Sequence, residues 1–224
     1  MKLLSIILPA RNEEFLNQTI DDIFRHSELA DNMEILVGLD GLKNWETKQL
    51  CESKVADILV PYMDVRVLKE DNSIGQRAMQ NKLAKMATGK FLLKLDAHVS
   101  MSQGFDKVMV EIMEANPNIV LVPALTNLHV YNWVCPQGHR TYQGKVDKCG
   151  QCEETKLEKE LVWQNNTKIY SDFKFSEDLI FEYGDLENYE MLHEVKAIQG
   201  SGIMVSKENY FKWQLCDESW GSWG

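Results

Sequence analysis

The sequence contains no long apolar run and no excess of basic residues. None of its hydrophobic stretches approaches the roughly 20 residues that a membrane-spanning helix needs, and the opening MKLLSIILPARNEE carries charged residues too early for a signal peptide. Its 24 Lys and Arg residues stand against 34 Asp and Glu residues, a net charge of −10, whereas binding to duplex nucleic acid needs clustered basic side chains. We therefore expect a cytoplasmic protein that has no membrane span and binds no nucleic acid.

Cysteine is also scarce, with five residues in 224. An odd number of cysteines, two of which (Cys51 and Cys216) lie far from any other, argues against the disulfide framework of a small secreted protein. A hydrophobic content of 44% is nevertheless enough to build one full-size domain with a core. We expect a single domain over residues 1–224, with a small insert at residues 134–153.

Short apolar runs alternate with amphipathic stretches along the chain. The apolar runs predict strands, and stretches with apolar residues every three or four positions predict helices. The expected strands are 3–8, 34–39, 65–68, 91–95 and 119–122, and the expected helices are 14–30, 46–56, 75–87 and 105–115. Strands separated by helices indicate an α/β fold with a mostly parallel central sheet that is covered by helices on both faces.

Polar residues follow three of the expected strands, in the segments 9–13, Asp40-Gly41 and Asp96-Ala97-His98. Ligands of such sheets gather beyond the carboxyl ends of the strands, so all three segments would lie at the ligand-binding edge. Because side chains alternate along an extended segment, Asp96 and His98 would project the same way and could grip a metal ion. The alternative is that the polar residues only form turns, since Asp-Gly is a strong turn signal.

The segments SIILPARNE, VGLDG and IGQRAMQNKLAKMATGKFLLKLDAH together resemble the nucleotide-binding half of a family 2 glycosyltransferase with the GT-A fold. The resemblance covers the chain apart from an insert near residues 130–165. It implies a nucleotide-sugar site formed by Pro9, Ala10, Arg11, Glu13, Asp40, Gly75, Arg77, Asn81 and Asp96. Within that site, Asp40 would hold the uracil and Arg77 would face the diphosphate.

The third motif reads Asp-x-His rather than Asp-x-Asp, which is similar to the polypeptide N-acetylgalactosaminyltransferases. The run IQGSGIMVSKENYFKWQLCDESWGSWG also resembles a strand, helix and Trp-Gly-rich segment of those enzymes. This likeness implies that the donor sugar lies beside Gly200, Ser201, Gly202 and Trp220. In the relatives an acidic residue follows the Trp-Gly-rich segment. Since this sequence stops at Gly224, we expect the natural base to be missing and place Asp217 as its substitute.

Sugar transfer from a nucleoside diphosphate leaves negative charge on the diphosphate, which a divalent cation stabilises as a Lewis acid. Asp96 and His98 would hold that cation. The imidazole shifts the preference from Mg²⁺ toward Mn²⁺, and we expect Mn²⁺ with a UDP sugar as donor. His129 and His193 are candidates for a third ligand, and water or diphosphate oxygens are the alternative. The acceptor, whether glycan, polypeptide or another molecule, and the stereochemistry of transfer stay open.

A second group of metal ligands lies in the insert. The segments Cys135-Pro-Gln-Gly-His139 and Cys149-Gly-Gln-Cys152 provide three thiolates and one imidazole at spacings typical of a tetrahedral Zn²⁺ site. Disulfides or unliganded thiols are the alternatives. Four protein ligands leave no open position for a substrate, so the zinc would be structural. Trp133, Trp163 and Tyr170 flank the insert, either as platforms for sugars or, as we favour, as packing anchors.

The function that we expect is therefore metal-dependent glycosyl transfer. A catalytically impaired module that binds nucleotide sugars or glycans, derived from a truncated transferase, is the second candidate. A Rossmann-type cofactor enzyme is disfavoured, because PARNE stands after the first strand in place of Gly-x-Gly-x-x-Gly.

Overall fold

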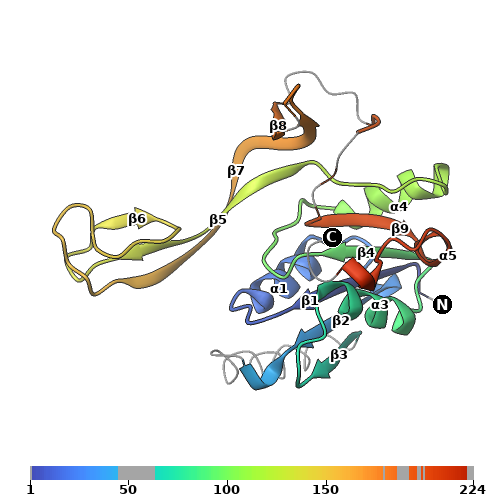
Figure 1. The fold of residues 1–224 in the computed structure, drawn as a ribbon, viewed down its shortest axis with the longest axis horizontal. Helices are drawn as coiled ribbons and strands as arrows, with labels where there is room; N and C mark the ends of the chain where they lie inside the picture. Colours follow the sequence, from blue (N-terminus) through green and yellow to red (C-terminus); the bar gives the residue numbers. More distant parts are fainter. Residues whose placement is uncertain are drawn as a thin grey trace. The chain divides into compact units, whose positions relative to one another are not determined.

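The computed structural model describes residues 2–44, 64–178, 180–185, 192–195, 198 and 200–220. The chain divides into two compact units, of which the first comprises Met1–Pro123 with Gln199–Gly224 and the second comprises Ala124–Ile198. Figure 1 shows the elements of both units. No helix among the described residues combines the length and the apolar character needed to cross a membrane.

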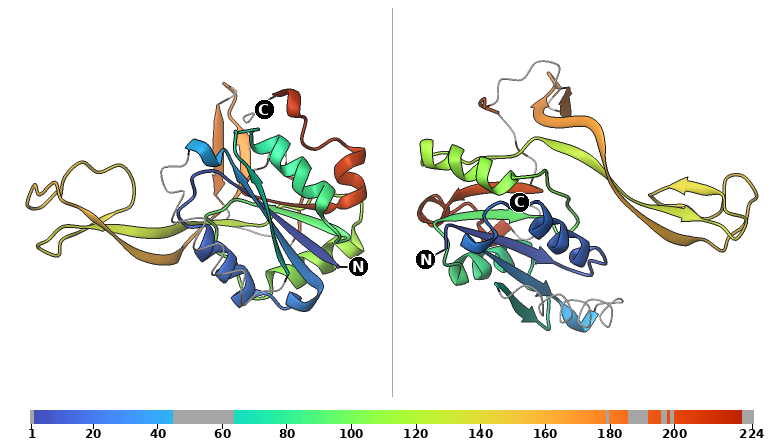
Figure 2. Two further views of the ribbon diagram at one scale, coloured as in Figure 1. Left: turned by 90° about the horizontal axis from the view of Figure 1, so that it is seen from below. Right: turned by 180° about the vertical axis from the view of Figure 1, so that it is seen from behind.

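The first unit is built on a five-stranded sheet with the strand order β3-β2-β1-β4-β9 (Figures 1 and 2). Its strands are β1 (Leu4–Ala10), β2 (Met33–Asp40), β3 (Val65–Glu70), β4 (Phe91–Leu95) and β9 (Gly202–Ser206). Strands β1 to β4 are parallel, and β9 runs antiparallel to β4. The predicted α/β fold with a mostly parallel sheet is confirmed.

Helices cover both faces of this sheet, as Figure 2 shows. Among the described residues the helices are α1 (Leu16–His26), α3 (Gln76–Met86), α4 (Phe105–Ala115) and the short α5 (Lys207–Lys212), with the 3-10 helices η1 (Ala30–Asn32), η2 (Leu42–Asn44) and η3 (Glu218–Trp220). Side chains of α1 and α4 share one hydrophobic core with the sheet, and those of α3 and α5 share another. Strand β2 is buried along its whole length, which explains why MEILVGLD reads as a nearly continuous apolar run.

The expected strand at 119–122 was wrong. Leu121 forms only an isolated antiparallel bridge to Met204 of β9, with both backbone hydrogen bonds at 2.8 Å. Its side chain is buried in the core, which accounts for the apolar signal at this position. The fifth strand of the sheet is β9 instead. The expected helix at 46–56 lies outside the described residues.

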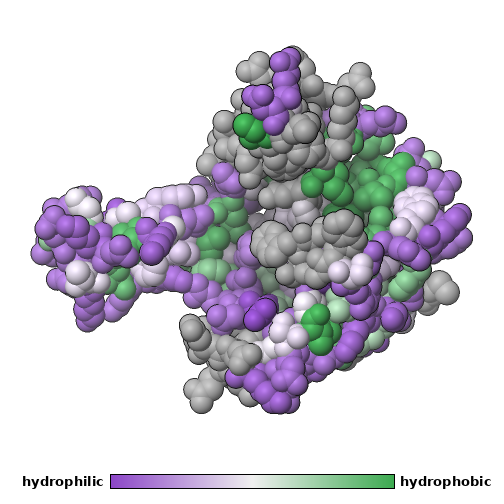
Figure 3. Space-filling model, viewed as in Figure 1, coloured by the Kyte–Doolittle hydropathy of each residue, from purple (hydrophilic) through white to green (hydrophobic). Residues whose placement is uncertain are grey.

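The second unit contains a four-stranded antiparallel sheet with the order β6-β5-β7-β8. Its strands are β5 (Leu125–Val134), β6 (Arg140–Tyr142), β7 (Glu158–Phe175) and β8 (Phe181–Asp185). The surface of the part formed by β5, β6 and the start of β7 is mainly hydrophilic (purple in Figure 3). The sequence reading missed this sheet, because its strands lack the buried apolar runs that mark the first unit.

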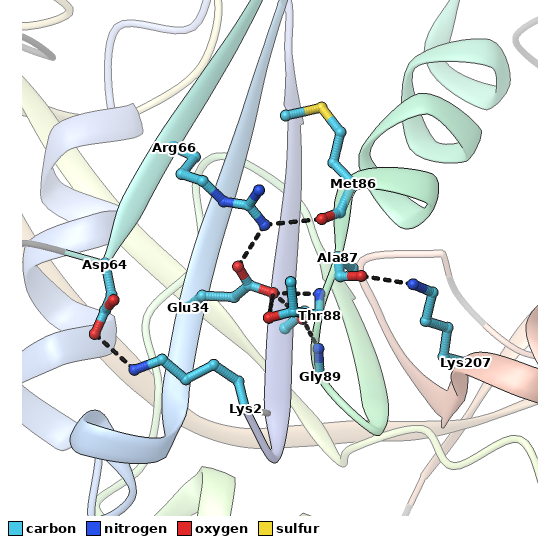
Figure 4. Close-up of polar contacts among 10 residues, drawn as sticks. Lys2, Glu34, Asp64, Arg66, Met86, Ala87, Thr88, Gly89 and Lys207 are labelled. Carbon is cyan, nitrogen blue, oxygen red and sulfur yellow. Dashed lines mark hydrogen bonds and ion pairs between the residues drawn. The ribbon is translucent and has the colours of Figure 1, made fainter.

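A polar network closes the amino ends of the parallel strands (Figure 4). The buried Glu34 carboxylate accepts hydrogen bonds from Ser5 Oγ at 2.6 Å, from the Thr88 backbone N–H at 2.6 Å and from Arg66 Nη2 at 2.5 Å. Burial alone would raise the pKa of Glu34, but the hydrogen bonds from Ser5, Thr88 and Arg66 outweigh burial and lower it. This end of the sheet is therefore stabilised as structure, and Glu13, Asp40 and Asp96-Ala97-His98 lie at or after the opposite, carboxyl ends of β1, β2 and β4.

Candidate functional site

The loops after β1 and β4 meet through Glu13 and His98. Strands β1 and β4 are parallel neighbours, so their carboxyl ends adjoin. One Glu13 oxygen lies 2.8 Å from His98 Nδ1, and the other accepts the backbone N–H of Phe15 at 3.0 Å, near the start of α1. A histidine whose Nδ1 is held by a carboxylate presents Nε2 to a metal ion in a fixed orientation. The His98 side chain is 56% exposed.

The groups around His98 shift its pKa in both directions. The hydrogen bond with Glu13 is the largest influence on the His98 pKa and raises it, and the negative charges of Glu13 and Asp96 raise it further. Burial and the nearby Lys94 act in the opposite direction. The net increase means that the surroundings of His98 stabilise the protonated, positively charged imidazole.

Asp96 is anchored on one side by a buried lysine. Lys94 Nζ contacts Asp96 Oδ1 and the backbone carbonyl of Gly200, and the Lys94 side chain is only 7% exposed. The backbone N–H of Asp96 donates to the Ser201 carbonyl at 2.9 Å. The segment Gly200–Ser201, implicated by the resemblance, therefore lies directly against the Asp-x-His motif. The sequence reading overlooked Lys94, although a lysine within the apolar run FLLKL signals a buried charge that needs a partner.

Helix α1 supports the loop that carries His98. Thr19 Oγ1 donates to the Ala97 carbonyl at 2.9 Å and accepts the Val99 backbone N–H at 3.1 Å, so one hydroxyl holds the residues on both sides of His98. Asp22 accepts the backbone N–H of Met101 at 2.6 Å. Neither Thr19 nor Asp22 was predicted as a site residue, because their partners lie almost 80 positions away in the sequence and no local pattern marks them.

Asp40 is buried and shapes the loop that leads into α3. Its carboxylate accepts hydrogen bonds from Ser73 Oγ at 2.8 Å, from the Ile74 backbone N–H at 2.8 Å and from the Gly75 backbone N–H at 3.1 Å. Gly75 precedes α3 with φ +89°, a backbone conformation that favours glycine. The role of Asp40 and Gly75 in holding the nucleotide stays a prediction, and the observed contacts give Asp40 a part in positioning this loop.

Asn81 on α3 ties this helix to the C-terminal segment. Its amide donates to the Cys216 carbonyl at 2.9 Å and to Glu218 Oε1 at 2.8 Å, and its oxygen accepts the Tyr210 hydroxyl at 2.8 Å. Arg77, one turn earlier on the same helix, is partly exposed. The nucleotide contacts predicted for Asn81 and Arg77 are not tested by these interactions.

The remaining predicted site residues lie at ends of strands or in the C-terminal segment. Ala10 ends β1 and is buried, whereas Arg11 after it is exposed. A side chain at Gly202 would lie 3.0 Å from Pro123 Cγ, so this glycine permits close packing. Asp217 is exposed, and its Oδ1 accepts the Ser219 backbone N–H at 2.9 Å at the start of η3, the helix that contains Trp220. The parts assigned to Pro9, Ala10, Arg11, Gly200, Ser201, Gly202, Asp217 and Trp220 stay predictions.

In the second unit the four predicted zinc ligands converge. The ligand atoms of Cys135, His139, Cys149 and Cys152 all lie within 4.8 Å of one another. The sulfurs of Cys135 and Cys152 are 3.7 Å apart, far beyond a disulfide bond. Two thiolates that each bind zinc at about 2.3 Å in a tetrahedron are about 3.8 Å apart, so the observed spacing suits a shared metal ion.

The pKa values of two thiols in this cluster are shifted in opposite directions. Against the effect of a backbone hydrogen bond at Glu154, burial and the thiols of Cys149 and Cys135 raise the pKa of Cys152 to about 11. Backbone N–H groups of Gln151 and Cys152 point at the Cys149 sulfur and lower its pKa to about 6. Cys149 is thus largely a thiolate near neutral pH, which is the form that binds metals. His139 Nδ1 lies 3.6 Å from the Cys135 sulfur and 3.7 Å from the Cys149 sulfur, so Nδ1 is the nitrogen that faces the cluster.

Two other predicted residues of the second unit make local contacts. Trp133 donates its indole N–H to the Gly144 carbonyl at 2.8 Å and packs edge-on against Tyr131, as expected of a packing anchor. His129 Nε2 lies 2.9 Å from Asn132 Oδ1, and its ring packs against Tyr142. These contacts do not assign His129 to a metal ion. The role of His193 as a metal ligand also stays a prediction.

The chain is similar in sequence to one protein family and in fold to solved structures. The sequence profile of glycosyl transferase family 2 matches residues 5–174. A crystal structure of GalNAc-T7 with UDP, GalNAc and Mn²⁺ superposes with a TM-score of 0.68 at 16% identity, covering 99% of this chain and 38% of that chain. A structure of S. aureus TarS residues 1–349 with UDP-GlcNAc has a TM-score of 0.46 at 21% identity, covering 55% of this chain and 34% of that one. No curated protein matches the sequence. The first likeness confirms the GT-A fold over a chain that spans 38% of the length of GalNAc-T7.

Proposed function

Because the chain belongs to glycosyl transferase family 2, we propose that it transfers a sugar from a UDP sugar with the help of a divalent cation held by Asp96 and His98. The observation that carries this proposal is the convergence of Glu13, His98 and Asp96 at the carboxyl ends of β1 and β4. The GalNAc-T7 structure that shares the fold was obtained with UDP, GalNAc and Mn²⁺, which is consistent with such a site.

The side chains fit a divalent cation. The Asp96 side chain is 29% exposed and has a second carboxylate oxygen besides the one that contacts Lys94, and His98 presents Nε2. A mixed set of carboxylate and imidazole favours Mn²⁺, with Mg²⁺ as the alternative. When bound, the cation would stabilise the negative charge on the departing diphosphate. Glu13 would keep the imidazole in the orientation that coordination requires.

Other residues of this unit are proposed to position the donor. Arg77 on α3 would contact the diphosphate, and the loop shaped by Asp40 would lie beside the uridine. The backbone of Gly200, which contacts Lys94, would lie next to the sugar. Asp217 is the proposed base, since it is an exposed carboxylate in a segment that Asn81 fastens to α3. A hexose or N-acetylhexosamine is the proposed sugar, and a glycan or polypeptide the proposed acceptor.

Calorimetric titration tests the donor site. UDP and several UDP sugars are titrated into the protein with Mn²⁺ or with EDTA, and the parent is compared with His98→Ala. UDP binding that requires Mn²⁺ and is lost in His98→Ala supports the proposal. Gln103→Ala, a change at an exposed polar residue a few positions further along, is the control and should bind like the parent. Binding that ignores both the metal and His98 would contradict the proposal. Release of UDP, measured separately, distinguishes a transferase from a module that only binds the donor.

For the second unit, we propose that Cys135, His139, Cys149 and Cys152 bind one structural Zn²⁺. The separations of the ligand atoms and the low pKa of Cys149 support this assignment. The metal would hold the segment between β5 and β7 together, where few apolar side chains are available to do so.

A further inference from the structure

Lys94 is a cation inside the core of the first unit. It is the next-to-last residue of β4, between Leu93 and Leu95, and it is in register with Ile7 of β1 and Ile203 of β9. Its relative exposure is 6%, similar to that of its apolar neighbours. A lysine charge in such surroundings is tolerated only when a partner compensates it, because the ammonium has lost most of its water.

The structure shows that partner to be Asp96. Lys94 Nζ contacts one carboxylate oxygen of Asp96 and the carbonyl oxygen of Gly200. The carbonyl is neutral, so Asp96 supplies the negative charge that balances the buried ammonium. Asp96 is also the carboxylate that the proposed function assigns to the divalent cation. One carboxylate would therefore serve two positive charges.

The Lys94 ammonium should weaken the binding of a divalent cation to Asp96. A divalent cation held by Asp96 would lie close to the Lys94 ammonium, and the repulsion between them would be weakly screened, since the lysine is buried. The cation by itself therefore gains less from Asp96 than it would from an unpaired carboxylate. A nucleoside diphosphate adds negative charge on the solvent side of the cation and offsets this repulsion.

On the basis of the proposed transferase function, we propose that Lys94 is the internal counter-cation of Asp96 and makes divalent-cation binding depend on the nucleoside diphosphate. Lys94 would act through Asp96 and not on the substrate, so it is a positioning residue. Without nucleotide, its ammonium keeps the Asp96 carboxylate in place and adjacent to Gly200. With nucleotide, Mn²⁺ and the diphosphate bind as a neutralising pair, and each increases the affinity for the other by the same factor.

The charge is tested by measuring Mn²⁺ affinity from the electron paramagnetic resonance signal of free Mn²⁺, with and without UDP. Lys94→Met keeps the length of the apolar stem and removes the charge. We expect it to bind Mn²⁺ alone at least about tenfold more tightly than the parent does, and to show a smaller gain in affinity when UDP is added. Lys90→Met, at an exposed lysine just before β4 that pairs with Glu114, is the matched control and should leave Mn²⁺ affinity unchanged. Unchanged or weaker Mn²⁺ binding by Lys94→Met would overturn the proposal.

The pairing is tested independently by thermal unfolding without metal. Asp96→Asn leaves the Lys94 charge buried without its partner, so this variant should unfold at a clearly lower temperature than the parent. Adding Lys94→Met to Asp96→Asn should recover much of that loss, whereas additive losses would overturn the pairing. If Lys94→Met does not fold, the Mn²⁺ affinity of the parent protein provides the test. Mn²⁺ binding by the parent that is equally tight with and without UDP would contradict the proposal. If Mn²⁺ fails to promote UDP binding in the parent, the transferase function fails, and the unfolding cycle still measures the ion pair.

Discussion

His98 Nδ1 lies 2.8 Å from the Glu13 carboxylate, and this contact joins the loops that follow two neighbouring parallel strands. The same glutamate accepts the backbone N–H of Phe15 near the start of α1. Glu13 is thereby fixed relative to the sheet edge, and its second oxygen holds the His98 imidazole in one orientation.

Glu13→Ala should weaken Mn²⁺ binding in the presence of UDP by about 10 to 100-fold, since a ligating histidine loses the carboxylate that orients it. The same change should lower the pKa of His98, because the hydrogen bond with Glu13 is the main cause of its increase. Calorimetry measures the first effect, and an NMR titration of the imidazole measures the second. Glu14→Ala, at the exposed neighbouring glutamate, serves as the control. A His98 pKa that stays the same in Glu13→Ala would show that the contact is not made in solution.

Thr19→Val should destabilise the protein by about 1–3 kcal/mol. The substitution keeps the shape of the side chain and removes the hydroxyl, so the Ala97 carbonyl and the Val99 N–H lose their shared partner in a buried place. Urea unfolding followed by circular dichroism measures the change. Thr19→Ser retains the hydroxyl and should recover most of the stability. If valine and serine behave alike, the hydroxyl does not support the His98 loop.

Asn81→Ala should loosen the C-terminal segment from α3. The substitution removes the amide N–H groups that donate to the Cys216 carbonyl and to Glu218, and the oxygen that accepts the Tyr210 hydroxyl. The free energy of unfolding should fall by about 1–3 kcal/mol. Limited proteolysis should then cut the segment after α5 faster than in the parent. Tyr210→Phe removes one of these contacts and should have a smaller effect in the same direction. Proteolysis at the parental rate would contradict the role of Asn81 as a fastener.

The Glu34 network predicts a loss of stability in acid. The pKa of Glu34 in the folded protein is lowered from its ordinary value of 4.5, so the folded state binds fewer protons at this site than the unfolded state does. The contribution of Glu34 is therefore complete above pH 4.5 and declines as the pH falls through its folded-state pKa. Denaturant unfolding between pH 3 and pH 7 should show this decline in the parent and a smaller one in Glu34→Gln. Equal slopes for the two proteins would contradict the assignment.

Zinc removal should affect the second unit. We expect one Zn²⁺ per chain by elemental analysis, and Co²⁺ substitution should give the visible absorption of a tetrahedral thiolate site. Cys149→Ser should lose the metal and make the segment between β5 and β7 more susceptible to proteolysis, because metal binding contributes to its folding. Cys216→Ser, in the other unit, is the matched control and should retain the metal. A metal-free protein with the same resistance to proteolysis would show that the cluster has no structural role.

Most of the parallel sheet was predictable from sequence because β1, β2 and β4 are buried on both faces. Phe91–Leu95 and Phe105–Ala115 have the expected bounds, since a continuous apolar run and a regular apolar stripe both register directly in the sequence. A strand was expected at 119–122 because the segment is apolar. Leu121 is indeed buried, but its backbone pairs with β9 only through one isolated bridge to Met204. The sheet of the second unit was missed because β7 is an 18-residue strand rich in polar residues.

The site was predictable only in part. The Asp-x-His motif and the Cys and His spacings are local patterns, and local patterns are visible in one sequence. The contacts of Thr19 and Asp22, and that of Lys94 with Gly200, depend on which loops the fold brings together, so neither composition nor spacing reveals them. Asp40 and Asn81 were recognised by resemblance, and the structure adds hydrogen bonds within the protein that the resemblance did not imply.

The most direct measurement is anomalous diffraction at the manganese absorption edge from crystals grown with UDP and Mn²⁺. We predict a peak within coordination distance of an Asp96 carboxylate oxygen and His98 Nε2, with the diphosphate on its solvent side. A manganese peak that lies elsewhere, with UDP bound away from the ends of β1 and β4, would contradict the proposed donor site.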